Sequence, residues 1–138
     1  MKRFILLAAC VGVSVAYAQN KTPSKESQIN TALIAAPEMY KDGAKVIGYN
    51  ASGEIITLRE GSNGLVCLAD DPNNKGISVA CYSDKLEPYM ARGRALIAEG
   101  KTEKEKQEYR KKEIDDGVLI MPDEPAAVYV VTGSEGRL

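Results

Sequence analysis

The feature that most restricts the fold of this chain is a pair of cysteines, Cys67 and Cys81, on either side of a polar loop. Residues 65–69 are apolar, and over 77–82 apolar residues alternate with small or polar ones, as in a strand with one buried face. The intervening residues 70–76 are rich in Asp, Asn, Pro and Gly, as in a loop. Pairing of the two strands about this loop brings Cys67 opposite Cys81, within the ~7 Å between Cα atoms that a disulfide requires.

The first eighteen residues have the pattern of a secretory signal peptide. Two basic residues precede an almost wholly apolar run over 4–16, and Ala-Tyr-Ala at 16–18 has the small-x-small form that signal peptidase accepts. The apolar run is shorter than the ~20 residues that a membrane-spanning helix needs. We therefore expect cleavage after Ala18 and export to the periplasm or the medium.

A lipoprotein signal is the alternative interpretation of the same segment. Leu-Ala-Ala-Cys at 7–10 matches a lipobox, in which the cysteine is acylated. The apolar stretch before Cys10 is short for such a signal, and it continues past the cysteine, so we favour cleavage after Ala18. We expect membrane attachment only if Cys10 is lipidated.

Export leaves Cys67 and Cys81 as the cysteines of the mature chain, and these two allow one pairing. A structural disulfide is the default state of such a pair outside the reducing cytosol. Two free buried thiols or a redox-active dithiol are the alternatives. Thirteen residues separate the two cysteines, unlike the C-x-x-C spacing of active dithiols.

Composition excludes several kinds of chemistry. The chain contains no histidine, so it has no Ser-His-Asp or Cys-His nucleophile system and no His-ligated zinc or haem. Its formal net charge of −1 gives no electrostatic footprint for nucleic acid.

Residues 95–102 match the loose spacing of a phosphate-binding loop but lack its glycine-rich turn, so we expect no nucleotide. Calcium at Asp70 and Asp71 is a weaker alternative to a solvated turn, because Lys75 stands where an oxygen ligand belongs; we predict no metal and no cofactor.

The rest of the sequence predicts a single α+β domain over 25–133, preceded by a flexible segment over 19–24 and followed by a flexible tail over 134–138. We expect an antiparallel sheet of four to five strands packed against two to three helices, with one disulfide. Hydrophobic periodicity and capping signals place the helices at 24–35, 86–99 and 102–115 and the strands at 45–49, 54–59, 65–69, 77–82 and 127–132, with a short extended segment at 118–121.

Three local details accompany this outline. Asn63-Gly64 lies between apolar runs, which predicts a type I′ hairpin between the strands at 54–59 and 65–69. The middle helix is expected to share one face among Leu86, Tyr89, Met90, Gly93 and Ile97. The last helix is strongly charged, and we expect Tyr109 to attach it lightly to the domain.

The segment over 57–64, Thr-Leu-Arg-Glu-Gly-Ser-Asn-Gly, followed by Cys67-Leu68 and Cys81-Tyr82, resembles a group of small exported bacterial proteins of unassigned function. In that group an Ala-rich helix precedes an R-E-G-x-N-G-x-x-C segment, and a second cysteine, a helical pair and a terminal apolar strand follow. The resemblance covers residues 29–131. It implies a bacterial origin and the fold outline above, and it implies no substrate.

These observations favour a non-enzymatic envelope protein that binds another envelope protein or a cell-wall component. Arg59, Glu60 and Asn63 are the candidate binding residues, because the tip of a hairpin exposes polar groups and the guanidinium fork recognises carboxylates or phosphates. A carboxylate-dependent hydrolase of an envelope substrate is the alternative. Its acidic pairs are each adjacent in sequence, and adjacent side chains diverge, so we predict no catalytic residue; the pairs are Asp70/Asp71, Asp115/Asp116 and Asp123/Glu124.

Overall fold

A computed structural model describes residues 22–134 of the chain, in which a five-stranded sheet and three α-helices form an α+β fold with one disulfide, as predicted. The predicted signal peptide and Cys10 lie outside the described residues. In chain order the elements are α1 (Lys25–Ala32), η1 (Leu33–Ala35), η2 (Glu38–Tyr40), β1 (Lys45–Tyr49), β2 (Ile55–Arg59), β3 (Leu65–Leu68), β4 (Ile77–Ser83), η3 (Asp84–Leu86), α2 (Glu87–Ala98), α3 (Glu103–Asp115) and β5 (Val128–Gly133).

The sheet has the strand order β2-β1-β3-β4-β5. Three of its four pairings are antiparallel, as expected, but β1 and β3 run parallel, so the sheet is mixed. Consequently β2 and β3 are separated by β1, and the predicted hairpin at Asn63-Gly64 is wrong. Gly64 has a φ of +76°, but no non-glycine residue of the described chain has a positive φ, so Asn63 lacks the conformation of a type I′ turn.

The connection from β2 to β3 instead passes across the beginning of β1. Gly61 lies so close to this strand that a Cβ atom added to it would stand 2.2 Å from the backbone nitrogen of Lys45. Only glycine permits this approach, which explains why the chain crosses β1 at this residue.

The predicted β3–β4 hairpin and its disulfide are confirmed. Cys67 stands directly opposite Cys81 in the antiparallel register, and their sulfur atoms are 2.09 Å apart. Both cysteines are fully buried. The disulfide therefore joins two central strands inside the core.

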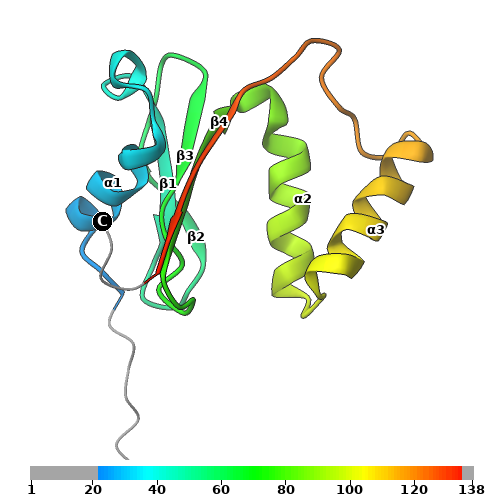
Figure 1. Ribbon diagram of the computed structural model, residues 1–138, viewed down its shortest axis with the longest axis horizontal. Helices are drawn as coiled ribbons and strands as arrows, with labels where there is room; N and C mark the ends of the chain where they lie inside the picture. Colours follow the sequence, from blue (N-terminus) through cyan, green and yellow to red (C-terminus); the bar gives the residue numbers. More distant parts are fainter. Residues whose placement is uncertain (1–21, 135–138) are drawn as a thin grey trace, which may run out of the picture.

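The two faces of the sheet carry different helices (Figure 1). α1 begins at the cap Ser24, whose hydroxyl accepts a hydrogen bond from the Ser27 amide, and together with η1 it packs on one face. The larger core cluster lies there, between small residues such as Ala32 and Ala35 and the inner side of the sheet. A smaller cluster that includes Tyr82, Leu86 and Met90 lies on the opposite face, beside α2.

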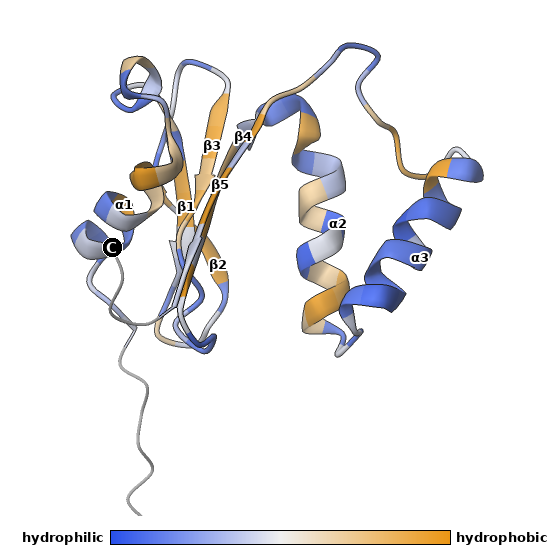
Figure 2. Cartoon of the chain, in the orientation of Figure 1, coloured by the Kyte–Doolittle hydropathy of each residue, from blue (hydrophilic) through white to orange (hydrophobic). Residues whose placement is uncertain are grey.

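α2 and α3 form a helical hairpin whose second helix is almost entirely hydrophilic (Figure 2). Within α2, Leu96 is the fully buried large residue, whereas the predicted Ile97 is half exposed. The expected attachment by Tyr109 is also wrong: Tyr109 is exposed, and the buried residue of α3 is Arg110. Its guanidinium stacks on the Tyr89 ring, 3.9 Å from the ring centroid, beside a glycine of α2.

The segment that follows α3 has no strand where a short one was expected, at 118–121. Its backbone is irregular, and two amides near its start, those of Val118 and Leu119, both donate to the carbonyl of Glu113. Among the helices of residues 22–134, none has the length and apolarity needed to cross a bilayer.

Candidate functional site

A pocket of about 280 Å³ lies at the end of the sheet where β3 begins and β4 ends. Its polar and aromatic lining comes from four separate parts of the chain: η2, the crossing before β3, the β4–η3 junction and the start of β5. The side chains that give it chemical character are those of Tyr40, Asn63, Ser83, Lys85 and Tyr129.

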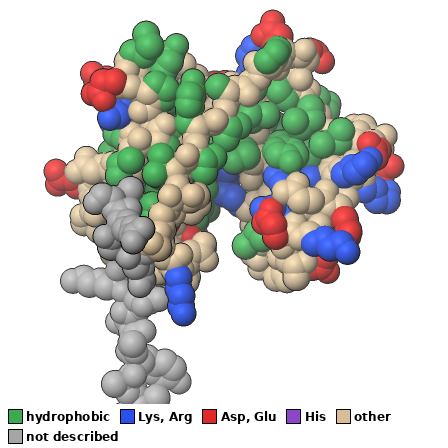
Figure 3. Space-filling view, viewed as in Figure 1, with side chains coloured by type: hydrophobic (Ala, Val, Ile, Leu, Met, Phe, Trp, Pro, Cys, Tyr) green, Lys and Arg blue, Asp and Glu red, His purple; other side chains and the backbone are tan. Residues whose placement is uncertain are grey.

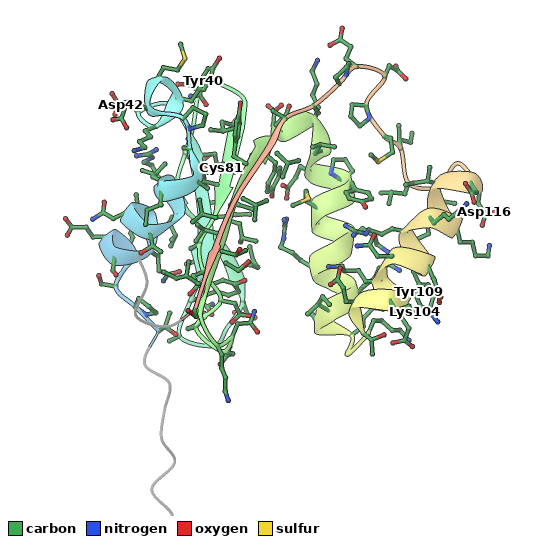
Figure 4. The ribbon with its side chains drawn as sticks, in the orientation of Figure 1. Tyr40, Asp42, Cys81, Lys104, Tyr109 and Asp116 are labelled. Carbon is green, nitrogen blue, oxygen red and sulfur yellow. A yellow bond between two sulfur atoms is a disulfide. The ribbon has the colours of Figure 1, made fainter. Side chains whose placement is uncertain are left out.

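Tyr40 is the exposed aromatic residue of this pocket. It ends η2, and Figure 4 shows it at the same end of the molecule as Asp42. Its relative exposure of 41% leaves part of the ring accessible to a ligand. Tyr129 comes from β5, where it pairs with Cys81 and packs against the core. The pocket therefore has one accessible ring and one held in place by the core.

Asn63 lines the pocket and also secures the backbone of Tyr40. Its side-chain amide donates to the Tyr40 carbonyl at 2.7 Å, and its side-chain oxygen accepts from the Leu65 amide at 3.1 Å. The backbone amides of Ser62 and Asn63 both donate to the carbonyl of Gly43. Asn63 thus joins η2 to the beginning of β3.

Arg59 does not line the pocket; it bonds to the turn that follows Tyr40. Its Nε and Nη2 donate to the Ala44 carbonyl at 3.1 and 2.9 Å, and Nη2 also donates to the Lys41 carbonyl. These bonds hold the turn between η2 and β1. The side chain that we predicted as a binding residue therefore supports the segment carrying Tyr40.

Glu60 does not take part in this arrangement. Its side chain is 80% exposed, and its carboxylate lies 3.8 Å from the ammonium group of Lys45. It does not line the pocket. Of the three candidate binding residues, the structure thus places Asn63 in the pocket, Arg59 in hydrogen bonds to the adjoining turn and Glu60 on the open surface.

Lys85 supplies the cationic group of the pocket. Its ammonium donates to the carboxylate of Glu124 at 2.8 Å, and both side chains are more than half exposed. A solvent-exposed ion pair of this kind contributes little to stability, so Lys85 can exchange its partner at small cost. The pocket therefore offers a donor for an anionic or carbonyl group beside its aromatic ring.

Sequence reasoning missed Tyr40, Lys85 and Tyr129 as site residues. They are separated along the chain by other elements, and no spacing relates them to Asn63. An exposed tyrosine next to a turn is common on protein surfaces, so the sequence carries no distinctive signal for them. Only the sheet topology brings them together.

A second polar cluster joins Tyr82 of β4 to two charged residues of α2. The Tyr82 hydroxyl donates to Glu87 at 2.6 Å and accepts from Arg94 at 2.9 Å, and Arg94 also donates to Glu87. Burial, followed by the hydrogen bond to Glu87, raises the pKa of Tyr82. Burial and the nearby carboxylate of Asp71 raise the pKa of Tyr49 to about 12. The polar groups of Tyr82, Glu87 and Arg94 bond to one another, which is the arrangement of a structural network.

In each acidic pair considered for hydrolysis, at least one carboxylate already has a hydrogen-bond or ion-pair partner. Asp70 accepts from the Ser78 amide, Asp71 accepts from the Asn73 amide, and Glu124 accepts from Lys85. Asp115 and Asp116 pair with lysines one turn earlier in α3. Across residues 22–134, no three His, Cys, Asp or Glu side chains come close enough together to hold a metal ion.

Comparison of the chain with protein-family models, with curated proteins and with solved structures gave no match.

Proposed function

We propose that the protein is a non-enzymatic binding protein of the bacterial envelope, and that it binds a short segment of another envelope protein in the pocket beside Tyr40. The main support is that one pocket brings together an accessible aromatic ring, an amide, a hydroxyl and an ammonium group that can change its ion-pair partner. These groups belong to Tyr40, Asn63, Ser83 and Lys85. A mostly preformed hollow with a few convergent polar groups is the usual form of a ligand site. At about 280 Å³, it suits one or two side chains of a peptide.

The hydrogen bonds of Arg59 and Asn63 support this proposal, because they fix the carbonyl of Tyr40 and the turn that follows it. A prearranged site loses less conformational entropy on binding. Substitution of Arg59 is a poor test, because it also removes the bonds that hold the turn over 41–44. The test therefore uses exposed residues.

The test is capture from envelope extract with two matched pairs of variants. Tyr40→Ala and Lys85→Ala remove pocket groups, whereas Tyr109→Ala and Lys104→Ala remove the same residue types from α3 (Figure 4). The relative exposure of Tyr109, 42%, matches that of Tyr40. We expect the pocket variants to lose the partner at least tenfold while the α3 variants retain it.

Equal capture by all four variants contradicts the pocket assignment. Cosedimentation with purified cell-wall sacculi distinguishes a cell-wall ligand from a protein one. Binding to sacculi that depends on Tyr40 assigns the pocket to the cell wall instead.

Export is part of the same proposal, and the buried disulfide is compatible with an oxidising compartment. Intact-mass measurement of protein recovered from the producing bacterium checks it. We expect loss of the first eighteen residues and no alkylatable thiol. Release of the protein from membranes by Cys10→Ser instead indicates lipid anchoring.

A further inference from the structure

Within residues 22–134, the last strand, β5, is one edge of the sheet and leaves a row of backbone groups unpaired. The Ser83 amide donates to the Ala127 carbonyl, and the register with β4 continues without interruption to Gly133. Hydrogen-bonded pairs alternate in an antiparallel ladder, so Ala127, Tyr129 and Val131 direct their backbone groups toward β4. The backbone groups of the alternate residues point outward; these residues are Val128, Val130 and Thr132.

The side chains of this edge are apolar and accessible. Val128 and Val130 have relative exposures of 47% and 58%. β5 lies in front of β4 in Figure 1, and the space-filling view from the same side shows apolar side chains along and around it (Figure 3). This edge therefore joins unsatisfied backbone groups to an apolar surface.

β5 also lacks the features that keep sheet edges from pairing. Its sequence from 128 to 133 has no charge and no proline, and its register with β4 has no bulge. The opposite edge strand, β2, ends in Arg59, follows Glu54, and has a register shift against β1. Natural proteins protect exposed edges by charges and bulges, and here only β2 is protected.

We propose that β5 pairs with β5 of a second copy of this chain, antiparallel and about a two-fold axis at Val130. The strand is self-complementary in this register. Val130 faces Val130 of the second copy, Val128 faces Thr132, and on the other side of the sheet Tyr129 faces Val131. Each outward residue then both donates and accepts, for about six backbone hydrogen bonds. The side-chain pairs are β-branched or aromatic, which favours cross-strand packing, and no charges oppose each other.

The contact is small, which sets its expected strength. One strand pairing with its flanking side chains buries less than the ~1,200 Å² of a standard stable interface. The dimer is therefore concentration-dependent, with half-association at micromolar or higher protein. It shares Tyr129 with the pocket but does not use Tyr40 or Lys85, so the variants that test the pocket leave the residues of the dimer contact unchanged.

The first test is the solution mass of the exported, processed protein over a range of concentrations, by sedimentation or light scattering. We expect twice the monomer mass at high concentration. Val130→Lys should restore the monomer mass at every concentration, whereas Thr57→Lys, on the exposed edge strand β2, should leave the dimer intact. Circular dichroism verifies that both variants are folded.

The second test reads the register directly. Across the two-fold axis the Cα atoms of the Val130 pair lie ~5.5 Å apart, so Val130→Cys should form an intermolecular disulfide on oxidation. Two Val128 residues are separated by about four residues along the strand, or ~14 Å, so Val128→Cys should not form one. A monomer at all concentrations, a dimer lost in Thr57→Lys rather than Val130→Lys, or equal cross-linking of both cysteine variants would each overturn the proposal.

Discussion

Gln28 shows how one buried polar side chain connects two layers of this fold. Its amide nitrogen donates to the carbonyls of Pro23 and Tyr49, and its amide oxygen accepts from the Tyr49 backbone amide at 2.8 Å. The Gln28 side chain also lies close to Gly48. A Cβ atom added to Gly48 would stand 2.5 Å from the amide oxygen of Gln28. Gln28 therefore fixes α1 against the end of β1.

Gln28→Ala should lower the free energy of unfolding, because it leaves partly buried backbone groups of Tyr49 unpaired. Each such group costs about 1–3 kcal/mol. The matched control is Gln107→Ala, since Gln107 is exposed on α3 and donates only to Glu103. We expect the control to change stability by less than about 0.5 kcal/mol in urea unfolding. Equal effects of the two variants would contradict this role of Gln28.

At the scale of elements, the α2–α3 hairpin depends on charged groups more than the sheet does. Arg92 donates to both carboxylate oxygens of Glu113, at 2.8–3.0 Å. The Thr102 side chain and the Glu105 carboxylate cap α3 reciprocally. The guanidinium of Arg92 holds the pKa of Glu113 below its usual range, and hydrogen bonds from Thr102 do the same to the pKa of Glu105.

These shifts predict an acid-sensitive hairpin. A carboxyl group with a lowered pKa in the folded state stabilises it above the ordinary glutamate pKa of about 4.3, and this stabilisation is lost as the pH falls further. Helical circular dichroism should therefore decline below about pH 4.3. Glu113→Gln should weaken that pH dependence and lower stability at neutral pH. Glu108→Gln, on the exposed part of α3, should change neither.

For the whole molecule, the disulfide is the strongest single constraint on the unfolded chain. Cys67 and Cys81 are separated by fourteen positions and join β3 to β4 in the centre of the sheet. Closing a loop of about 15 residues stabilises a protein by ~3 kcal/mol in the chain-entropy model. Both cysteines are fully buried, so a reductant reaches them only when the domain opens.

The double variant Cys67→Ala/Cys81→Ala should reduce the free energy of unfolding by ~3 kcal/mol or more, because it also removes buried sulfur atoms. Urea unfolding of the oxidised protein and the variant measures the difference. The oxidised protein should resist a mild reductant under native conditions and lose its disulfide near the unfolding midpoint. Similar unfolding midpoints for the two proteins would show that the bond contributes little.

Local sequence patterns predicted most of the helices and strands, but not all of the contacts between them. The alternating residues before Ser83 and the loop over 70–76 identify the β3–β4 hairpin, because their signals are short-range. The same reasoning failed at Asn63-Gly64, since a turn signal does not reveal that β1 is inserted between β2 and β3. It also failed for Arg110, whose burial depends on the Tyr89 ring of another helix.

By itself, the sequence determined the α+β class, the disulfide pairing and the absence of histidine chemistry, because each depends on residue identity or on spacing within one hairpin. The tertiary structure alone decided that β1 and β3 are parallel, that Arg59 supports a turn, and that Tyr40 and Lys85 share a pocket. Those features arise from contacts between segments far apart in the chain. Such contacts depend on how the whole domain packs, and local sequence patterns do not predict them.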